Sequence, residues 1–212
     1  MFPQPSAGAQ AIWLDLLAAT DEERAKAEEI FGSPLPSRES LSEIESSSRM
    51  RSRDGVLFMS IPSAAPHPTG EGGASPIGFM LSCDHLVTIR YTPLKSFDDI
   101  AARFSSDGAA PASGLETFVA ICEEIVDRIA DGLEHVAGEI APLSQAAFHV
   151  DDVEGRKAVR SNKLLRVQLR SLGRHGDRLS EIRDALVGLG RITTYAGHNT
   201  QAWSDDQIKE RL

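Results

Sequence analysis

The chain is poor in cysteine and in long apolar runs. Its 212 residues include only two cysteines, Cys83 and Cys122, which exclude a disulfide framework and a C-x-x-C zinc or redox site, and favour a reducing compartment. The longest apolar run, 118–122, has about five residues, far below the roughly 18 that a membrane-spanning helix needs. Residues 1–10 have no basic or apolar segment of the kind found in signal peptides. A hydrophobic content of 41% still supplies a packed core, so a disordered chain is excluded.

The motifs of several enzyme classes are also missing. There is no G-x-x-x-x-G-K-[ST], no G-x-G-x-x-G after a strand and no G-x-S-x-G, and no two histidines have the spacing of metal ligands. Cys83, Asp84 and His85 are consecutive, so they cannot all face one centre, and a hairpin turn is the better interpretation. We therefore expect no enzymatic activity.

Charge is unevenly distributed around a net value of −9, which disfavours nucleic acid as a partner and favours divalent cations or basic partners. Segment 115–148 has a net charge of −6, and segment 156–191 has a net charge of +7. The basic residues recur every three or four positions, as in a helix that follows a phosphate backbone. Pairing with the preceding acidic helix is the favoured alternative, because complementary flanks fix the register of two antiparallel helices.

The second half of the chain predicts two long helices. Apolar residues recur at spacings of three and four through both segments, and Asp151 or Asp152 can cap the second helix. We expect residues 114–212 to form a long antiparallel helical hairpin that ends at the start of a further helix. Its predicted contact residues are Leu115, Phe118, Cys122, Ile125, Ile129, Leu133, Val136, Ile140 and Leu143 in the first helix, and Leu165, Leu169, Leu172, Leu179, Ile182, Leu186 and Leu189 in the second.

Residues 12–108 predict a mixed domain of the α/β or α+β class after a disordered tail at 1–11, with the linker 105–114 leading to the hairpin. Strands are expected at 12–16, 56–61, 77–81 and 86–91, the last two as a hairpin. Helices are expected at 20–31, opened by a Thr20–Glu23 capping box, at 37–46, and around 97–104.

Acidic residues cluster in the short helix expected at 37–46. Glu39 and Glu43 are four residues apart and would share a helix face, with Glu45 nearby. Carboxylates are the hard oxygen ligands that Mg²⁺ and Ca²⁺ prefer. Such pairs are common on solvated helices, so the spacing alone favours an ordinary surface.

Four stretches together resemble the CorA family of magnesium and cobalt transport proteins. They are IWLDLLAATDEERAKAEEIFG (12–32), LPSRESLSEIESSSRM (35–50), VLFMSI (56–61) and GFMLSCDHLVTIRY (78–91), followed by the acidic and the Arg/Leu-rich helices. The resemblance implies a mixed sheet between helical layers (α/β/α), then long helices, in a homopentamer around a divalent-cation pore. It also implies a position at the cytoplasmic face of the bacterial inner membrane, with the membrane spans and the Gly-Met-Asn signature absent from this sequence.

The resemblance also implies where metal would bind. Family members sense Mg²⁺ between subunits, where acids of the short helix meet an acid of the stalk helix. Here Glu39 and Glu43 match the first region, Ser40 is no carboxylate, and Glu139 matches a further acid late in the first long helix. The ligand is expected to be Mg²⁺, with Co²⁺ or Zn²⁺ as alternatives. Two other functions stay open: a zinc-transporting branch of the superfamily, and a soluble coiled-coil adaptor.

Overall fold

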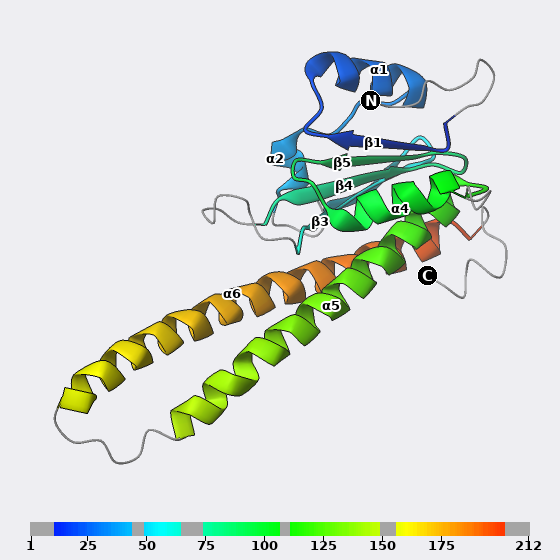
Figure 1. Cartoon of the computed structure of the whole chain (residues 1–212). Coiled ribbons are helices and arrows are strands. Elements are labelled where there is room, and N and C mark those ends of the chain that lie inside the picture. The colour runs from blue at the N-terminus through cyan, green and yellow to red at the C-terminus, as the bar shows by residue number, and fades with distance from the viewer. Residues whose placement is uncertain (1–10, 44–48, 65–73, 107–110, 149–155, 202–212) are drawn as a thin grey trace.

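The computed structural model describes residues 11–43, 49–64, 74–106, 111–148 and 156–201, without the side chains of 143–148 and 156–164 (Figure 1). The predicted tail, except Ala11, the Asp151 or Asp152 cap and the start of a further helix at 204–212 lie outside the described residues. The elements are β1 (Trp13–Leu17), α1 (Asp21–Phe31), α2 (Arg38–Leu41), β2 (Met50–Arg53), β3 (Val56–Pro62), β4 (Pro76–Leu81), β5 (Leu86–Arg90), α4 (Lys95–Ser106), α5 (Gly114–Phe148) and α6 (Arg156–Asn199).

A five-stranded mixed sheet forms the centre, in the order β1-β5-β4-β3-β2. β1 runs parallel to β5, and every other neighbouring pair is antiparallel. Side chains alternate between the two faces as the strand period of two requires. In β3, Leu57, Met59 and Ile61 face one core, whereas Val56 and Phe58 face the other. The predicted class, a mixed sheet between layers of helices, is confirmed.

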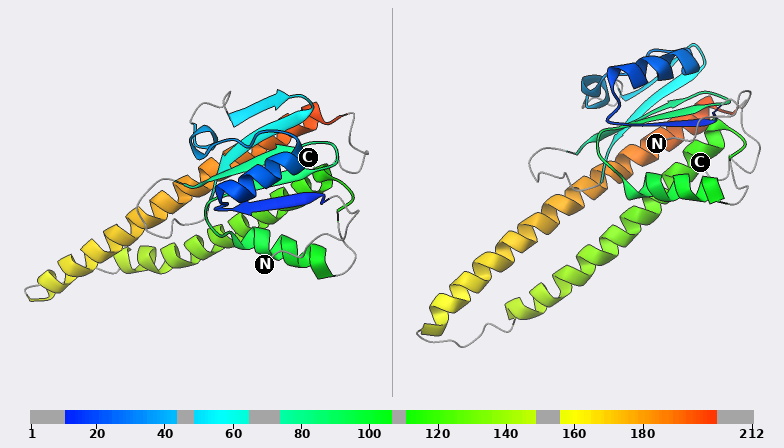
Figure 2. Two further views of the ribbon diagram at one scale, coloured as in Figure 1. Left: turned by 90° about the horizontal axis from the view of Figure 1, so that it is seen from above. Right: turned by 45° about the horizontal axis from the view of Figure 1, so that its top comes forward.

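One face of the sheet is covered by α1 and α2 (Figure 2). The predicted capping box is present at the start of α1, where the Thr20 hydroxyl accepts from the Glu23 amide and the Glu23 carboxylate accepts from the Thr20 amide. Helix α1 ends at Gly32, as the sequence predicts. Ala27 and Leu35 enter the core on this face, so α1 and the chain after it are fixed to the sheet.

The other face is covered by α4, α5 and α6, and the last two form the predicted antiparallel hairpin (Figure 1). Phe118 of α5 packs edge-to-face on Phe79 at a centroid distance of 5.5 Å. Gly188 of α6 lies over β3, where an added Cβ would be 3.2 Å from Ile61. The sheet and both long helices therefore share one core, and the rest of the hairpin projects beyond it. Within the described residues, no helix is long and apolar enough to cross a membrane.

Two elements differ from the sequence analysis. Strand β2, MRSR, was not predicted, because its polar residues lie at the exposed edge of the sheet and carry no apolar alternation. Asp54 and Gly55 join it to β3, both at positive φ, which is the geometry of a two-residue hairpin turn. The helix predicted at 37–46 is too long: it ends at Leu41, and residues 44–46 lie outside the described part of the chain.

Candidate metal-sensing site

Helix α2 carries the first candidate ligand, and the sheet holds this short helix in place. The Leu41 side chain is buried against Gly78 of β4, where an added Cβ would be only 2.7 Å from it. The Leu41 carbonyl accepts a hydrogen bond of 3.1 Å from the Ser60 hydroxyl inside the core. On the outer side, the Arg38 guanidinium stacks over the Tyr91 ring at 4.8 Å. Four residues cannot form a stable isolated helix, so these contacts fix its position.

Glu39 lies in the first turn of α2, exposed to solvent. Hydrogen bonds from its own backbone amide and from Ser37 lower the pKa of the Glu39 carboxyl, and Arg38 adds a smaller effect in the same direction. Ser37 is also the N-cap, and its hydroxyl accepts from the Ser40 amide at 3.2 Å. The carboxylate is therefore ionised at neutral pH and reachable from outside the molecule.

Glu43 is exposed and lies two residues beyond the end of α2. The prediction that Glu39 and Glu43 share a helix face is therefore wrong. The reason is local: the Ser42 hydroxyl bonds back to the Arg38 carbonyl at 2.8 Å, and Ser42 caps the helix. The Glu43 backbone carbonyl accepts from the Arg49 guanidinium, which brings a positive charge beside this residue.

Glu139 lies on α5, on the opposite side of the sheet from α2, with its side chain half exposed. Its carboxylate is 3.6 Å from Nε2 of His135, one turn earlier, and 3.8 Å from Nδ1 of His175 on α6. Glu139 thus lies where the two arms of the hairpin face each other.

The three candidate ligands do not converge within one chain. Nowhere in the described residues do three His, Cys, Asp or Glu side chains gather so that they could hold a metal ion. A site built from Glu39 and Glu43 therefore needs ligands from another source, such as water or a neighbouring copy.

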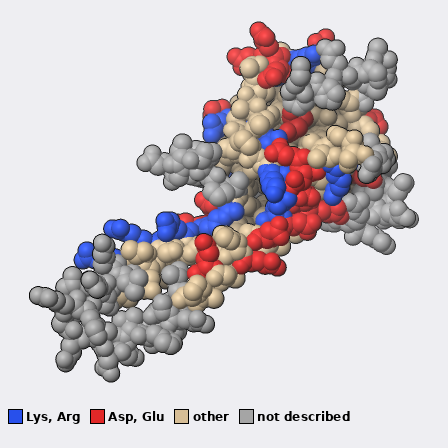
Figure 3. Space-filling view, in the orientation of Figure 1, with Lys and Arg blue, Asp and Glu red and all other residues tan. Residues whose placement is uncertain are grey.

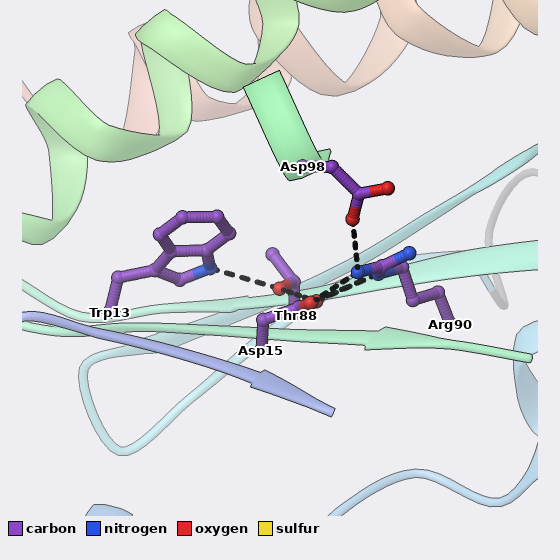
Figure 4. Close-up of polar contacts among 5 residues, drawn as sticks. All are labelled: Trp13, Asp15, Thr88, Arg90 and Asp98. Atoms are coloured by element: carbon purple, nitrogen blue, oxygen red, sulfur yellow. Dashed lines mark hydrogen bonds and ion pairs between the residues drawn. The ribbon is translucent and has the colours of Figure 1, made fainter. Parts of the chain in front are cut away.

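Sequence reasoning missed a buried polar cluster between the sheet and α4 (Figure 4). Arg90, on β5, donates to both oxygens of Asp15, on the parallel strand β1, at 2.8 to 3.2 Å. The exposed fractions are 6% for the Arg90 side chain and 16% for that of Asp15. The Thr88 hydroxyl donates to Asp15 at 2.7 Å and accepts from the Trp13 indole at 3.0 Å.

This cluster positions helix α4, and its buried carboxylate is already paired. Arg90 also contacts Asp98 of α4 at 3.5 Å and lies over the Phe97 ring at 4.9 Å. Guanidinium and hydroxyl groups already occupy the Asp15 carboxylate. A signal was available in the sequence: a charged residue inside each of two apolar strands needs a partner when both are buried.

The expected pairing of the basic helix with the acidic helix is not found at Arg166, Arg170 and Arg174, whose side chains the structure describes. Two acids of α5 pair with other groups. Glu124 pairs with Arg103 of α4 and with Arg128 of its own helix, and Asp131 also pairs with Arg128. Between α5 and α6, the Glu139 carboxylate lies 3.8 Å from Nδ1 of His175. Exposed bases follow the distal half of α6, whereas acids gather over α4 and the part of α5 nearer the sheet (Figure 3).

The predicted turn at 82–85 is confirmed. The Ser82 hydroxyl accepts from the His85 amide at 3.1 Å and donates to its carbonyl at 3.2 Å. Nδ1 of His85 faces the Ala11 carbonyl at 3.1 Å, and Cys83 is exposed. The segment is thus the turn that joins the neighbouring strands β4 and β5.

Comparison with known proteins gives a consistent relationship. The model of the family described as "CorA-like Mg2+ transporter protein" matches residues 8–212. The magnesium transport proteins CorA of Escherichia coli K12 and Salmonella typhimurium LT2 are each 27% identical over 139 residues, which is 64% of this chain and 43% of theirs. The chain thus matches less than half the length of these relatives.

Two solved structures share the fold. The soluble domain of CorA from Methanocaldococcus jannaschii superposes with a TM-score of 0.66 at 16% identity, covering 94% of this chain and 75% of that one. The full-length CmaX protein gives 0.58 at 14% identity, covering 94% and 60%. The family match extends over almost the entire sequence, and the chain belongs to the CorA-like Mg²⁺ transporter protein family.

Proposed function

We propose that this chain is the cytoplasmic, metal-sensing part of a CorA-like divalent-cation transporter. The observation that carries the proposal is the family match over residues 8–212, which includes both the sheet and the helical hairpin. The relatives that match are named as magnesium transport proteins. In this proposal the domain senses the transported ion and controls the pore, and carries out no chemical reaction.

Glu39 and Glu43 are the residues that we assign to sensing. Both are exposed, and carboxylates are ligands that Mg²⁺ prefers. Binding a cation requires little deprotonation or ordering of Glu39, because its carboxyl is already ionised and its helix is anchored to the sheet. Two carboxylates supply only part of an octahedral shell, so we assign the remaining positions to water and to a neighbouring subunit. Arg49 donates to the Glu43 backbone carbonyl, and its positive charge is expected to weaken cation binding there.

The mechanism follows from charge. At high Mg²⁺, ions between acidic faces of adjacent subunits hold the ring in one closed arrangement. When Mg²⁺ falls, repulsion between the carboxylates favours a looser ring and an open pore, which is a population shift. Moving such an equilibrium from almost fully open to almost fully closed needs about a 10⁴-fold preference. Five equivalent sites reach this value if each prefers the closed state only about sixfold, so weak sites are sufficient.

Thermal denaturation with and without MgCl₂ tests the assignment on the 212-residue chain. For a dissociation constant of about 1 mM, tenfold excess Mg²⁺ stabilises by about 1.4 kcal/mol, which raises the Tm by roughly 3 to 6 °C. We expect this shift in the wild type and its loss in Glu39→Gln/Glu43→Gln. The matched control is Glu29→Gln/Glu134→Gln, which removes the same charge from exposed helix positions elsewhere.

The outcomes separate the alternatives clearly. Equal shifts in both double variants would remove Glu39 and Glu43 from the site. A shift that grows with protein concentration supports a site between subunits, because Mg²⁺ then favours association. Parallel titrations with Co²⁺ and Zn²⁺ compare the affinities of the ions. A site with only oxygen ligands is expected to bind Zn²⁺ no more tightly than the general order of divalent-metal affinities predicts.

A further inference from the structure

The distal half of α6 carries an unusual run of positive charge. Between residues 155 and 176 the sequence has seven Lys or Arg residues and no acid. Arg166, Arg170 and Arg174 follow one another at intervals of four, so they form a stripe along one side of the helix. All three are exposed, and within the described residues no carboxylate lies at ion-pair distance from them.

Exposed apolar side chains accompany this arginine stripe. Leu169 is 66% exposed and lies three residues after Arg166, which makes the two neighbours on the helix surface. Val167 and Leu172 are more than half exposed on the adjoining turns. A ligand for this surface must therefore accept guanidinium groups and apolar side chains together.

The position of the stripe is as informative as its charge. The part of α6 that packs on the sheet is its C-terminal half, where Gly188 meets Ile61 and Ala185 and Leu189 are buried. The arginines lie on the half that projects away from the sheet (Figure 1; Figure 3). Elements α1 to α4 and the five strands do not cover it.

Two other partners fit less well. A nucleic acid would use the arginines but leave the leucines exposed, and the net charge of −9 opposes its approach. A second copy offers the acids of α5, but these gather toward the sheet end of the hairpin, whereas the stripe lies toward the other end (Figure 3). If copies of the chain formed a ring with its axis parallel to the hairpin, the α5 acids of one copy and the arginine stripe of the next would lie at different levels along that axis.

We propose that Arg166, Arg170 and Arg174, with Leu169 beside them, bind the surface of a membrane that contains anionic phospholipid. Guanidinium groups pair with headgroup phosphates, and a leucine among them enters the boundary between headgroups and acyl chains. This inference rests on the proposed function in one respect: a transporter domain works beside a bilayer. Metal sensing itself needs no lipid contact, so the two are separable.

Vesicle co-sedimentation of the 212-residue chain tests the inference, in EDTA so that no metal bridges the lipid. The vesicles are phosphatidylglycerol mixed with phosphatidylcholine, and phosphatidylcholine alone. The variant Arg166→Gln/Arg170→Gln/Arg174→Gln is expected to bind the anionic vesicles about 100-fold more weakly, since each arginine near the surface contributes about a fivefold effect. The matched control, Arg51→Gln/Arg53→Gln/Arg183→Gln, removes three exposed arginines elsewhere and is expected to bind like the wild type.

Three results would overturn the proposal: equal binding to both vesicle types, equal loss in both triple variants, or tighter binding to duplex RNA than to anionic vesicles. Concentration-dependent dimerisation that only the stripe variant abolishes would instead assign the surface to a second copy. Failure of the proposed function is visible elsewhere. It appears as an unchanged Mg²⁺-dependent Tm shift in Glu39→Gln/Glu43→Gln, whatever the vesicles show.

Discussion

Replacing Arg90 by methionine is expected to destabilise the domain strongly. Arg90 donates three hydrogen bonds to Asp15 between two parallel strands, and only 6% of its side chain is exposed. The methionine side chain has a volume similar to that of arginine and fills the same space, so the main effect is electrostatic. Asp15 would remain buried with the Thr88 hydroxyl as its donor. A buried carboxylate without its counter-ion is among the costlier defects in a protein core.

The magnitude follows from the burial of both groups. Breaking a buried ion pair by removing one partner costs about 3 to 5 kcal/mol. For a domain of this size, each kcal/mol lowers the Tm by about 2 to 4 °C, so Arg90→Met is expected to lower it by roughly 6 to 20 °C. Asp15→Leu is expected to cost a similar amount, because it leaves the guanidinium with Asp98 at 3.5 Å and with one nitrogen already unbonded.

Urea denaturation followed by far-ultraviolet circular dichroism measures these free energies. The control is Arg53→Met, since Arg53 forms an ion pair with Asp54 in which the side chains are 76% and 86% exposed, and no measurable change is expected. The double variant Asp15→Leu/Arg90→Met completes a cycle. Because it removes both charges, it should be less destabilised than the sum of the single variants by several kcal/mol. Additive effects, or a loss below about 1 kcal/mol for Arg90→Met, would show that this pair does not stabilise the sheet.

Two further predictions concern packing and thiol chemistry. Gly78→Ala places a methyl group 2.7 Å from the Leu41 side chain and is expected to lower the free energy of unfolding by about 1 to 3 kcal/mol. At Gly138 an added methyl group has no atom within 4 Å, so Gly138→Ala should stabilise α5 by about 0.5 to 1 kcal/mol. Urea denaturation of both variants measures these changes. With Ellman's reagent, the exposed Cys83 should react in the native state and Cys122 only after unfolding, because burial raises the pKa of the Cys122 thiol well above its usual value. Burial and the neighbouring Asp84 also raise the pKa of Cys83, so its reaction should accelerate as the pH increases.

The elements that the sequence predicted correctly have strong local signals. The capping box at Thr20, the turn at 82–85 and the short apolar runs of β3, β4 and β5 depend on residues close together in the chain. Strand β2 has no such pattern, but its Asp54-Gly55 turn is a recognisable hairpin signal. The short length of α2 depends on a competing side-chain bond from Ser42, which composition alone does not reveal.

The candidate site shows the same limit at longer range. Spacing in the sequence placed Glu39 and Glu43 together, yet the end of α2 separates their helical positions. The Asp15–Arg90 pair joins residues 75 positions apart, and only the parallel pairing of β1 with β5 brings them into contact. No local pattern specifies which strands become neighbours.

The helical hairpin shows why periodicity and charge have to be interpreted separately. The heptad-like apolar spacing correctly identified two long helices, but Leu165, Leu169 and Leu179 of the predicted seam are more than a third exposed. Burial on α6 is concentrated instead where it meets the sheet, at Ile182, Ala185 and Leu189. Periodicity therefore identifies the face of a helix that is apolar, and the partner that covers it is decided by the tertiary fold. The same holds for the charges: opposite signs on consecutive helices do not by themselves decide the pairing, since the Glu124 carboxylate of α5 lies 3.9 Å from the Arg103 guanidinium of α4.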